Sequence, residues 1–308
     1  MEHISVLLNE TVDSLNIKED GIYVDMTLGG AGHAREVLKR LKNGKLIGID
    51  QDEYAINRSK ENLTDFNNVI YVKDNYLNID NILKSLKIDR VDGIYMDIGV
   101  SSFQFDDPNR GFSYNYNSKL DMRMDREKKL DAYTIVNEFD EKELYHIIKN
   151  YGEEQFAKNI AKHICIDREI KKIETTFELV DIIKKSIPAK MRVGKHPAKR
   201  TFQALRIYVN DELNVLETTI DKAAELLKDK GRLAIISFHS LEDRIVKNKF
   251  KLLENPCTCD KRYPCICGKK SKGIVVTKKP IVSSEDEINN NNRSHSAKLR
   301  VFERIRND

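Results

Sequence analysis

The sequence lacks any long hydrophobic run, and this absence excludes a membrane-spanning helix. Such a helix needs about 20 consecutive apolar residues, a length that no segment of the 308-residue chain approaches. Residues 1–11 include Glu2 and Glu10 and have no basic stretch ahead of an apolar one, so we expect no secretory signal. Hydrophobic residues still make up 40% of the chain, enough to bury a core. We therefore expect a cytoplasmic protein that does not bind membranes.

Cysteine is scarce and unevenly placed. The chain has five cysteines, and four of them lie within residues 257–267. This clustering favours a reducing compartment and a metal site over a disulfide framework. Four soft ligands could form a tetrahedral Zn²⁺ site from Cys257, Cys259, Cys265 and Cys267. The spacing is C-x-C instead of the commoner C-x2-C, so the sequence leaves both zinc and unliganded thiols open.

Motifs of three common enzyme classes are missing. No G-x-x-x-x-G-K-[ST] segment occurs, which removes the simplest phosphoryl-transfer enzymes. If Gly30 and Gly32 begin a dinucleotide-binding motif, its third glycine is replaced by Arg35, which disfavours a nicotinamide-linked oxidoreductase. The G-x-S-x-G turn of many hydrolases is also absent, which disfavours a triad of Ser101, His239 and Asp243.

Acidic residues are absent from two basic segments. The net charge is only +4, but residues 184–206 contain eight Lys or Arg and no Asp or Glu, and residues 261–279 also lack acids. One such run is often just a solvated face. Two runs beside the same predicted core favour binding to nucleic-acid phosphates, because Lys and Arg contacts supply most sequence-independent affinity.

The hydrophobic pattern of the first hundred residues is typical of alternating strands and helices in a parallel sheet. Short apolar runs predict strands, and amphipathic segments predict helices between them. The predicted strands are residues 22–26, 45–49, 69–72 and 93–96, and the predicted helices are residues 33–41, 53–63 and 79–86.

A change of pattern splits this core. From residue 105 to about 204 the sequence is charged and has helical periodicity, with helices predicted at residues 141–150, 154–166 and 176–186. A helix at 213–227 and strands at 231–238, 273–276 and 298–305 follow, and residues 289–292 read as a polar linker. We predict an α/β fold with a doubly wound Rossmann-like sheet, formed by residues 1–104 and 205–308, and an inserted helical domain at 105–204.

The strongest local signal is the segment VDMTLGGAGH at residues 24–33, an apolar strand ending in an acid, then a small-residue loop and a helix. Gly29, Gly30 and Gly32 let the backbone approach a ligand closely, and the helix presents N–H groups to it. Asp50 ends the next strand 21 residues after Gly29, where doubly wound folds place the carboxylate that binds a ribose diol. The loop has no phosphate-binding lysine, so S-adenosylmethionine, which carries a ribose and no phosphate, suits it.

Two further strand ends offer side chains to the same edge. Asp97 ends the fourth strand, where open α/β folds bind their ligands. An acceptor there could bind the N–H of an exocyclic amine and localise its lone pair toward a methyl donor. The alternative is that Asp97 caps the next helix. Asp74 and Tyr76 follow the third strand, where an adenine could lie, although the residues alone favour Tyr76 as a partly buried core aromatic.

The segment SFHSLEDR, residues 237–244, follows a predicted buried strand and opens a charged helix. We interpret it as a wall of the pocket for the substrate base, with His239 as a candidate contact. His239 could instead be a histidine whose hydrogen bonds are satisfied at a strand end.

Long blocks along nearly the whole chain resemble a known family, the bacterial small-subunit ribosomal RNA cytosine-N4 methyltransferases (MraW or RsmH family). The blocks are HISVLLNE (3–10), DMTLGGAGH (25–33), DIGVSSFQ (97–104), DMRMD (121–125), YGEEQFA (151–157), HPAKRTFQALRIYVN (196–210), SFHSLEDRIVK (237–247) and RSHSAKLRV (293–301). The departures are few. Ala31 stands where the family often has glycine, and Ser5 where it often has proline.

The resemblance implies S-adenosylmethionine as cofactor, methyl transfer to N4 of a cytidine in the decoding region, and a helical insertion domain. The family's cofactor-binding positions correspond to Ala31, Gly32, His33, Asp50, Tyr76, Asp97 and Gln104. It also implies that the substrate is 16S rRNA, within assembled small ribosomal subunits.

A base paired in a helix is out of reach, so the target must be single-stranded or flipped out. We therefore predict that Lys199, Arg200 and Arg206 bind phosphates beside the pocket. A non-catalytic ribosome-binding module is the remaining alternative, and the intact loop with Asp50 and Asp97 opposes it. The sequence is compatible with a homodimer but does not fix the oligomeric state.

Overall fold

The computed structural model describes residues 5–100, 105, 107–192, 194, 196–260, 262, 264 and 266–306. The chain divides into two compact units, unit 1 with Met1–Gly99 and Leu213–Asp308, and unit 2 with Val100–Glu212. The expected boundary at residue 204 falls inside helix α10 (Lys199–Asn210), whose core residues pack in unit 2, so the division lies at Glu212 instead. None of the described helices is long and apolar enough to cross a membrane.

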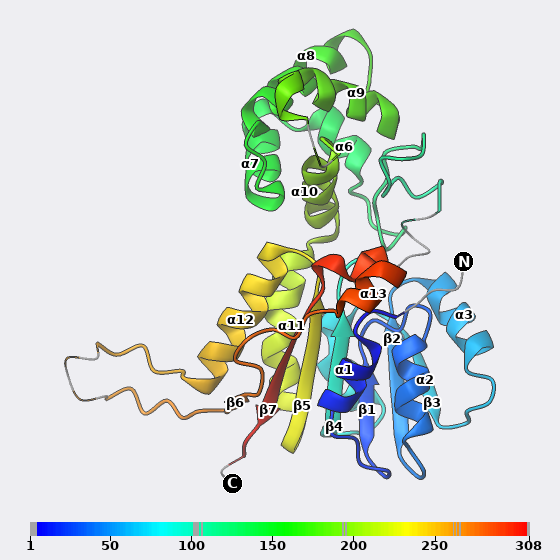
Figure 1. The fold of residues 1–308 in the computed structure, drawn as a ribbon, viewed down its shortest axis with the longest axis vertical. Helices are drawn as coiled ribbons and strands as arrows, with labels where there is room; N and C mark the ends of the chain where they lie inside the picture. The colour runs from blue at the N-terminus through cyan, green and yellow to red at the C-terminus, as the bar shows by residue number, and fades with distance from the viewer. Residues whose placement is uncertain are drawn as a thin grey trace. The chain divides into compact units, whose positions relative to one another are not determined.

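Unit 1 contains a seven-stranded sheet, counted over the described residues, in the order β3-β2-β1-β4-β5-β7-β6 (Figure 1). The strands are β1 (Ile22–Asp25), β2 (Lys45–Asp50), β3 (Val69–Lys73), β4 (Val91–Asp97), β5 (Leu227–Ser237), β6 (Gly273–Val275) and β7 (Lys298–Arg304). β1 to β5 pair in parallel, whereas β7 is antiparallel to both β5 and β6. Every strand predicted from the sequence is confirmed.

The strand order reverses between β1 and β4, which makes their carboxyl ends the switch point of the sheet. In open α/β folds, ligands bind in the crevice at such a point. The antiparallel β7 between β5 and β6 also departs from the all-parallel 3-2-1-4-5-6 order of the dinucleotide-binding fold. The Rossmann-like class is confirmed, with a mixed sheet in place of a fully parallel one.

Helices cover both faces of this sheet because successive strand residues point to opposite sides. Ile94 of β4 belongs to a buried cluster with α4 (Ile79–Ser85), α11 (Glu212–Leu226) and α12 (Ser240–Glu254). Its neighbour Tyr95 belongs to the opposite cluster with α1 (Leu8–Ser14), α2 (Gly32–Lys39) and α3 (Glu53–Asn62).

The C-terminal part of unit 1 holds one correction. The predicted linker at residues 289–292 is wrong in part, since α13 (Glu285–Asn290) ends within it and the 3-10 helix η3 (Asn292–Ser296) begins there. Ser284 caps α13 by accepting a hydrogen bond from the N–H of Glu287, so a local capping signal outweighs the polar composition of the asparagine run.

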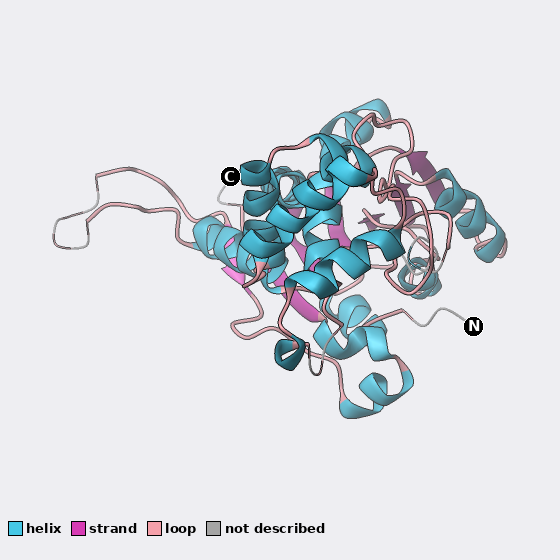
Figure 2. Cartoon of the chain, turned by 90° about the horizontal axis from the view of Figure 1, so that it is seen from above, coloured by secondary structure: helices cyan, strands magenta, loops and turns pink. Residues whose placement is uncertain are grey.

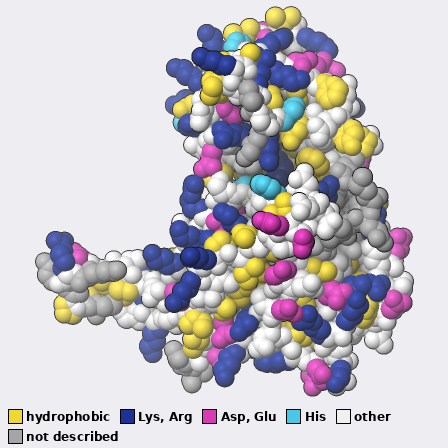
Figure 3. All heavy atoms as spheres, in the orientation of Figure 1, with side chains coloured by type: hydrophobic (Ala, Val, Ile, Leu, Met, Phe, Trp, Pro, Cys, Tyr) yellow, Lys and Arg dark blue, Asp and Glu magenta, His cyan; other side chains and the backbone are white. Residues whose placement is uncertain are grey.

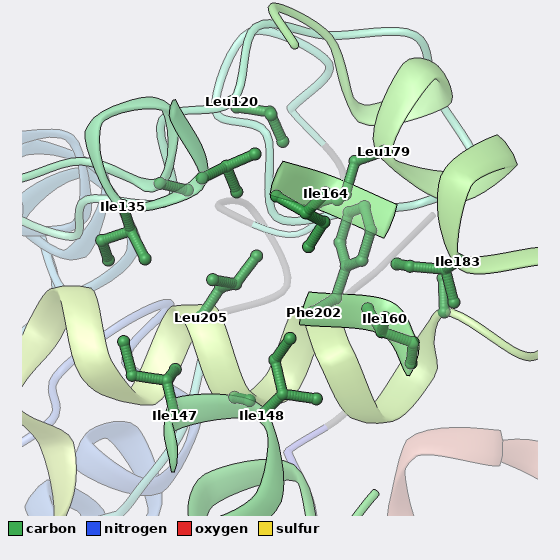
Figure 4. Close-up of a cluster of buried hydrophobic side chains, with 14 of the residues drawn as sticks. Leu120, Ile135, Ile147, Ile148, Ile160, Ile164, Leu179, Ile183, Phe202 and Leu205 are labelled. Carbon is green, nitrogen blue, oxygen red and sulfur yellow. The ribbon is translucent and has the colours of Figure 1, made fainter. Parts of the chain in front are cut away.

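Unit 2 is helical and has its own core. Its described helices are α6 (Ala132–Glu138), α7 (Glu141–Gly152), α8 (Ala157–Ile170), α9 (Thr176–Ser186), η2 (Ala189–Met191) and α10, shown with the other helices in Figure 2. Capping boxes start α7 and α9, which is why the sequence predicts these two starts well. Ile147 and Ile148 of α7 and Phe202 and Leu205 of α10 belong to one buried cluster (Figure 4).

Candidate active site

The loop after β1 is held on two sides. Leu28 N–H donates to the carbonyl of Ile49 in β2 at 3.0 Å, which continues the sheet pairing into the loop. From α3, Ser59 Oγ donates to the Gly29 carbonyl at 2.9 Å and Asn62 Nδ2 to the Gly30 carbonyl at 3.0 Å. The carbonyls of Gly29 and Gly30 are therefore bound by α3, which fixes the course of the loop.

Helix α2 starts directly after this loop. Ala31, the N-cap residue, has the left-handed conformation at φ 64°, a region that favours glycine. Gly32 lies so close to Ser5 that a Cβ atom would overlap the Ser5 hydroxyl. The buried ring of His33 has Nε2 3.0 Å from the carbonyl of Val6, so a ligand contact at His33 would come from its backbone. The N–H groups of this first turn have no partner within the helix and favour an anion.

Asp50, at the end of β2, accepts hydrogen bonds on both carboxylate oxygens. Gly29 N–H donates to Oδ2 at 2.9 Å and Asp52 N–H to Oδ1 at 2.9 Å. Burial raises the pKa of Asp50 to about 6, against the lowering effect of these hydrogen bonds. An ionised carboxylate has about four lone-pair sites, so two hydroxyl donors can still be accommodated. This suits a ribose diol.

The end of β3 leads into the 3-10 helix η1 (Tyr76–Asn78). Asn75 caps η1 by accepting from Leu77 N–H at 2.9 Å, and Asp74 accepts from Asn75 N–H and from Asn78 Nδ2. The ring of Tyr76 is partly buried against the cluster that includes Ile79. Asp74 therefore shapes the turn, and Tyr76 borders the core at the same edge of the sheet.

Asp97, at the end of β4, has a buried carboxyl oxygen with no hydrogen-bond partner. This atom is Oδ1, while the Asp97 N–H donates to Thr27 Oγ1 at 2.7 Å, beside the loop after β1. Burial, followed by the charges of Asp25 and Glu242, raises the pKa of Asp97 to about 8. A buried acceptor without a donor costs free energy unless a ligand completes it. The position calls for a donor or a positive charge from a ligand.

Asp25 is a second buried acid at the switch point. It ends β1, is 2% exposed, and accepts a hydrogen bond from Thr27 N–H at 3.0 Å. Burial raises its pKa to about 7, and the charge of Asp50 contributes in the same direction. Asp25, Asp50 and Asp97 thus end the three neighbouring strands β1, β2 and β4, and each has a raised pKa. Such clustering is typical of functional sites.

His239 is the N-cap residue of α12. Its Nδ1 accepts from Glu242 N–H at 3.4 Å, and its Nε2 lies 3.0 Å from Glu242 Oε1. The other oxygen of Glu242 accepts from the N–H groups of Phe238 and His239. The ring therefore caps α12 through Nδ1, while its buried Nε2 has no hydrogen-bond partner in spite of this short distance. Asp243 instead binds Lys298 and Arg300, which removes it from a hydrolase triad.

The three expected phosphate contacts differ from one another within unit 2. Lys199 and Arg200 are exposed in the first turn of α10, and Arg200 Nη1 makes a long hydrogen bond of 3.4 Å to the carbonyl of Glu153. Arg206 instead donates through Nε and Nη2 to both carboxylate oxygens of Glu212, each at 2.8 Å. A phosphate would have to share the Arg206 guanidinium with this bidentate ion pair.

Two of the expected site positions lie outside the described residues, Gln104 of the cofactor set and Cys265 of the cysteine set. Sequence reasoning gave no role to Asp25, Thr27 or Glu242, which surround Asp97. The sequence did contain a signal for Asp25. It directly follows the buried Val24, and burying a carboxyl group costs free energy unless the group is paired or serves a function. Glu242 could not be placed near Asp97 without the fold.

The fold and the acids at its switch point define the class, an α/β enzyme with a site for a nucleoside cofactor rather than a dinucleotide. Residues 1–305 match the MraW methylase family. A relative named ribosomal RNA small subunit methyltransferase H from Clostridium botulinum (strain Kyoto / Type A2) is 59% identical over 306 residues, 99% of each chain. One of the same name from Lachnospira eligens is 59% identical over 308 residues, 99% of this chain and 98% of the relative.

The chain therefore belongs to the MraW methylase family. This membership confirms the class expected from the sequence, a methyltransferase that depends on S-adenosylmethionine. It also removes the nicotinamide-linked oxidoreductase from consideration.

Proposed function

We propose that this enzyme methylates the N4 amine of a cytidine in the decoding region of 16S rRNA, within the small ribosomal subunit. The observation that carries the proposal is the buried Asp97 Oδ1 without a partner at the end of β4. The relatives' name, ribosomal RNA small subunit methyltransferase H, supports the choice of RNA.

The residues at the switch point fit S-adenosylmethionine. Asp50 would accept the ribose hydroxyls, and the N–H groups of Gly32 and His33 in the first turn of α2 would bind the methionine carboxylate. Gly29 and Gly30 bring the loop backbone close to the cofactor, and Tyr76 and Gln104 complete the cofactor set by family correspondence. Burial raises the pKa of Asp25 to about 7 and that of Asp97 to about 8, and a sulfonium cation bound beside them would favour their ionised forms.

Asp97 acts on the amine. The cofactor supplies a methyl group on a positively charged sulfur, open to in-line displacement. The lone pair of a cytosine amine is delocalised into the ring, and an N–H donated to Asp97 Oδ1 localises it on the nitrogen. As the N–C bond forms and the C–S bond breaks, the nitrogen becomes positive and must lose a proton. The ionised form of Asp97 is suited to accept it, because its pKa is raised to about 8.

His239 and Glu242 position this chemistry in the proposal. The imidazole fixes the first turn of α12 and pairs with Glu242, and the charge of Glu242 raises the pKa of Asp97. His239 then shapes the base pocket through Glu242.

Unit 2 recognises the RNA in this proposal. Lys and Arg side chains cover much of the face of the helical unit drawn in Figure 3, and the segment 184–206 has no acid. We expect Lys199→Ala and Arg200→Ala together to lower the slope of log affinity against log salt by about 1 to 2, since each phosphate contact contributes roughly 0.7 to 0.9. Arg206→Ala is the contrast and should leave the slope unchanged, because Glu212 already holds that side chain. A slope that falls only in the Arg206 variant would reverse the assignment.

Methyl transfer to small subunits that lack the modification tests the whole proposal. Labelled S-adenosylmethionine is supplied with native protein or Asp97→Ala, and the product is mapped by nucleoside mass spectrometry. We expect N4-methylcytidine with the native protein and a loss of about 100-fold or more in the variant. Cofactor binding without transfer to subunits or to naked RNA would refute the substrate and favour a non-catalytic ribosome-binding module.

A further inference from the structure

Between α12 and β6, the described residues 255–260, 262, 264 and 266–272 form a loop that extends away from the sheet of unit 1 (Figures 1 and 2). Its base is closed by a hydrogen bond from Lys272 N–H to the carbonyl of Leu253 at 2.9 Å. Beyond the base there is little apolar packing, and Ile266 is 92% exposed. Loops of more than about 12–15 residues without secondary structure are uncommon unless they serve a function or are disordered.

Three thiols converge within this loop. The sulfur atoms of Cys257, Cys259 and Cys267 all lie within 4.8 Å of one another, although up to ten positions separate them along the chain. Gly268 follows with φ 64°, which turns the chain directly after Cys267, and no atom lies within 4 Å of the position its Cβ would take. The ion pair of Asp260 with Arg262 is exposed, and such pairs add little to stability. Neither apolar burial nor charge pairing explains the convergence.

We propose that Cys257, Cys259 and Cys267 are ligands of a structural Zn²⁺ ion that closes the loop. Zinc bound tetrahedrally by thiolates at about 2.3 Å places the sulfur atoms roughly 3.8 Å apart. The separations of up to 4.8 Å are within about one ångström of that value, so a small movement of an exposed loop closes the site. The fourth cysteine of the sequence motif, Cys265, lies outside the described residues.

The charge around the loop agrees with a metal thiolate centre. Thiolate ligands outweigh the charge of the ion, so such a centre carries a net negative charge. Lys269 and Lys270 follow Gly268 and are exposed, and residues 261–279 contain no acid. Zinc would therefore hold a basic loop in one conformation, since structural metal sites contribute directly to the folding of segments without a hydrophobic core.

Metal analysis of the full-length protein, purified without chelator in a reducing buffer, tests the proposal. We expect close to one zinc per chain in the native protein and in Cys165→Ser, a matched control because Cys165 lies on α8 in unit 2. Cys257→Ser and Cys267→Ser should lose most of the metal. Substitution with Co²⁺ should give the visible bands of tetrahedral thiolate coordination in the native protein and not in these variants.

Limited trypsin digestion supplies a second readout that does not depend on metal content at purification. Chelation should speed cleavage after Arg262, Lys269 and Lys270 and leave the rest of the chain unchanged, and adding Zn²⁺ should reverse it. Less than about a tenth-equivalent of zinc after reconstitution, without cobalt bands, would overturn the proposal. So would full metal content in Cys257→Ser and Cys267→Ser. Methyl transfer is not part of either readout, so the test is independent of the proposed activity.

Discussion

Replacing Asp97 with asparagine should stabilise the fold while it abolishes methyl transfer. A carboxyl group in the unfolded chain has a pKa of about 3.9, whereas burial beside Asp25 and Glu242 raises the pKa of Asp97 to about 8 in the folded protein. Between these two pH values the folded state retains a proton that the unfolded state has lost. The free energy of unfolding of the native protein therefore falls as the pH rises, and stops falling above about pH 8.

The asparagine variant has no titrating group at this position, so its advantage over the native protein should grow with pH. The full slope is about 1.4 kcal/mol per pH unit, which gives at most about 2.7 kcal/mol between pH 5 and pH 7. For a folding unit of the size of unit 1, each kcal/mol of difference in the free energy of unfolding shifts Tm by roughly 2–4 °C.

The assay is thermal unfolding of cofactor-free protein at pH 5, 6, 7 and 8. Asp89→Asn, at an exposed aspartate, is the control and should show a difference from the native protein that is small and independent of pH. Transfer assays on the Asp97→Asn protein should show a loss of about 100-fold or more. A stability difference between Asp97→Asn and native protein that stays constant from pH 5 to pH 8 would refute the raised pKa and the reasoning built on it.

Other changes at the switch point test single contacts. Asp50→Ala should weaken S-adenosylmethionine binding by roughly 10-fold to 100-fold in calorimetry, because charge-assisted hydrogen bonds contribute about 1.5–3 kcal/mol; unchanged affinity would remove Asp50 from the cofactor site. Gly32→Ala should lower the free energy of unfolding by about 1–3 kcal/mol through overlap with Ser5, and Ser5→Gly in the same chain should restore it; no rescue would place the strain elsewhere. Ala31→Gly should raise the free energy of unfolding, measured in denaturant, by up to about 1 kcal/mol, since φ is 64° there. A lower free energy of unfolding would mean that the buried methyl group matters more than the backbone conformation.

Much of the fold was predictable because its signals are local. The strands of the core are apolar runs buried on both faces, and the helices that begin at residues 141 and 176 start with capping boxes. The signals failed where tertiary context outweighs composition. The asparagine-rich segment 289–292 contains the end of α13 and the start of η3. In the basic segment 184–206, the side chain of Arg206 forms an ion pair with Glu212.

The sequence by itself determined the loop after β1, the acids that end the strands and the family, because each depends on residue types at fixed spacing along the chain. Only the tertiary structure decided the pKa values of those acids. A pKa near 8 at Asp97 requires burial and the nearby charges of Asp25 and Glu242, residues 72 and 145 positions away in sequence. The convergence of Cys257 and Cys267 within one loop is likewise a matter of folding. Electrostatic interaction depends on distance in space and on solvent exclusion, neither of which can be read from spacing along a chain.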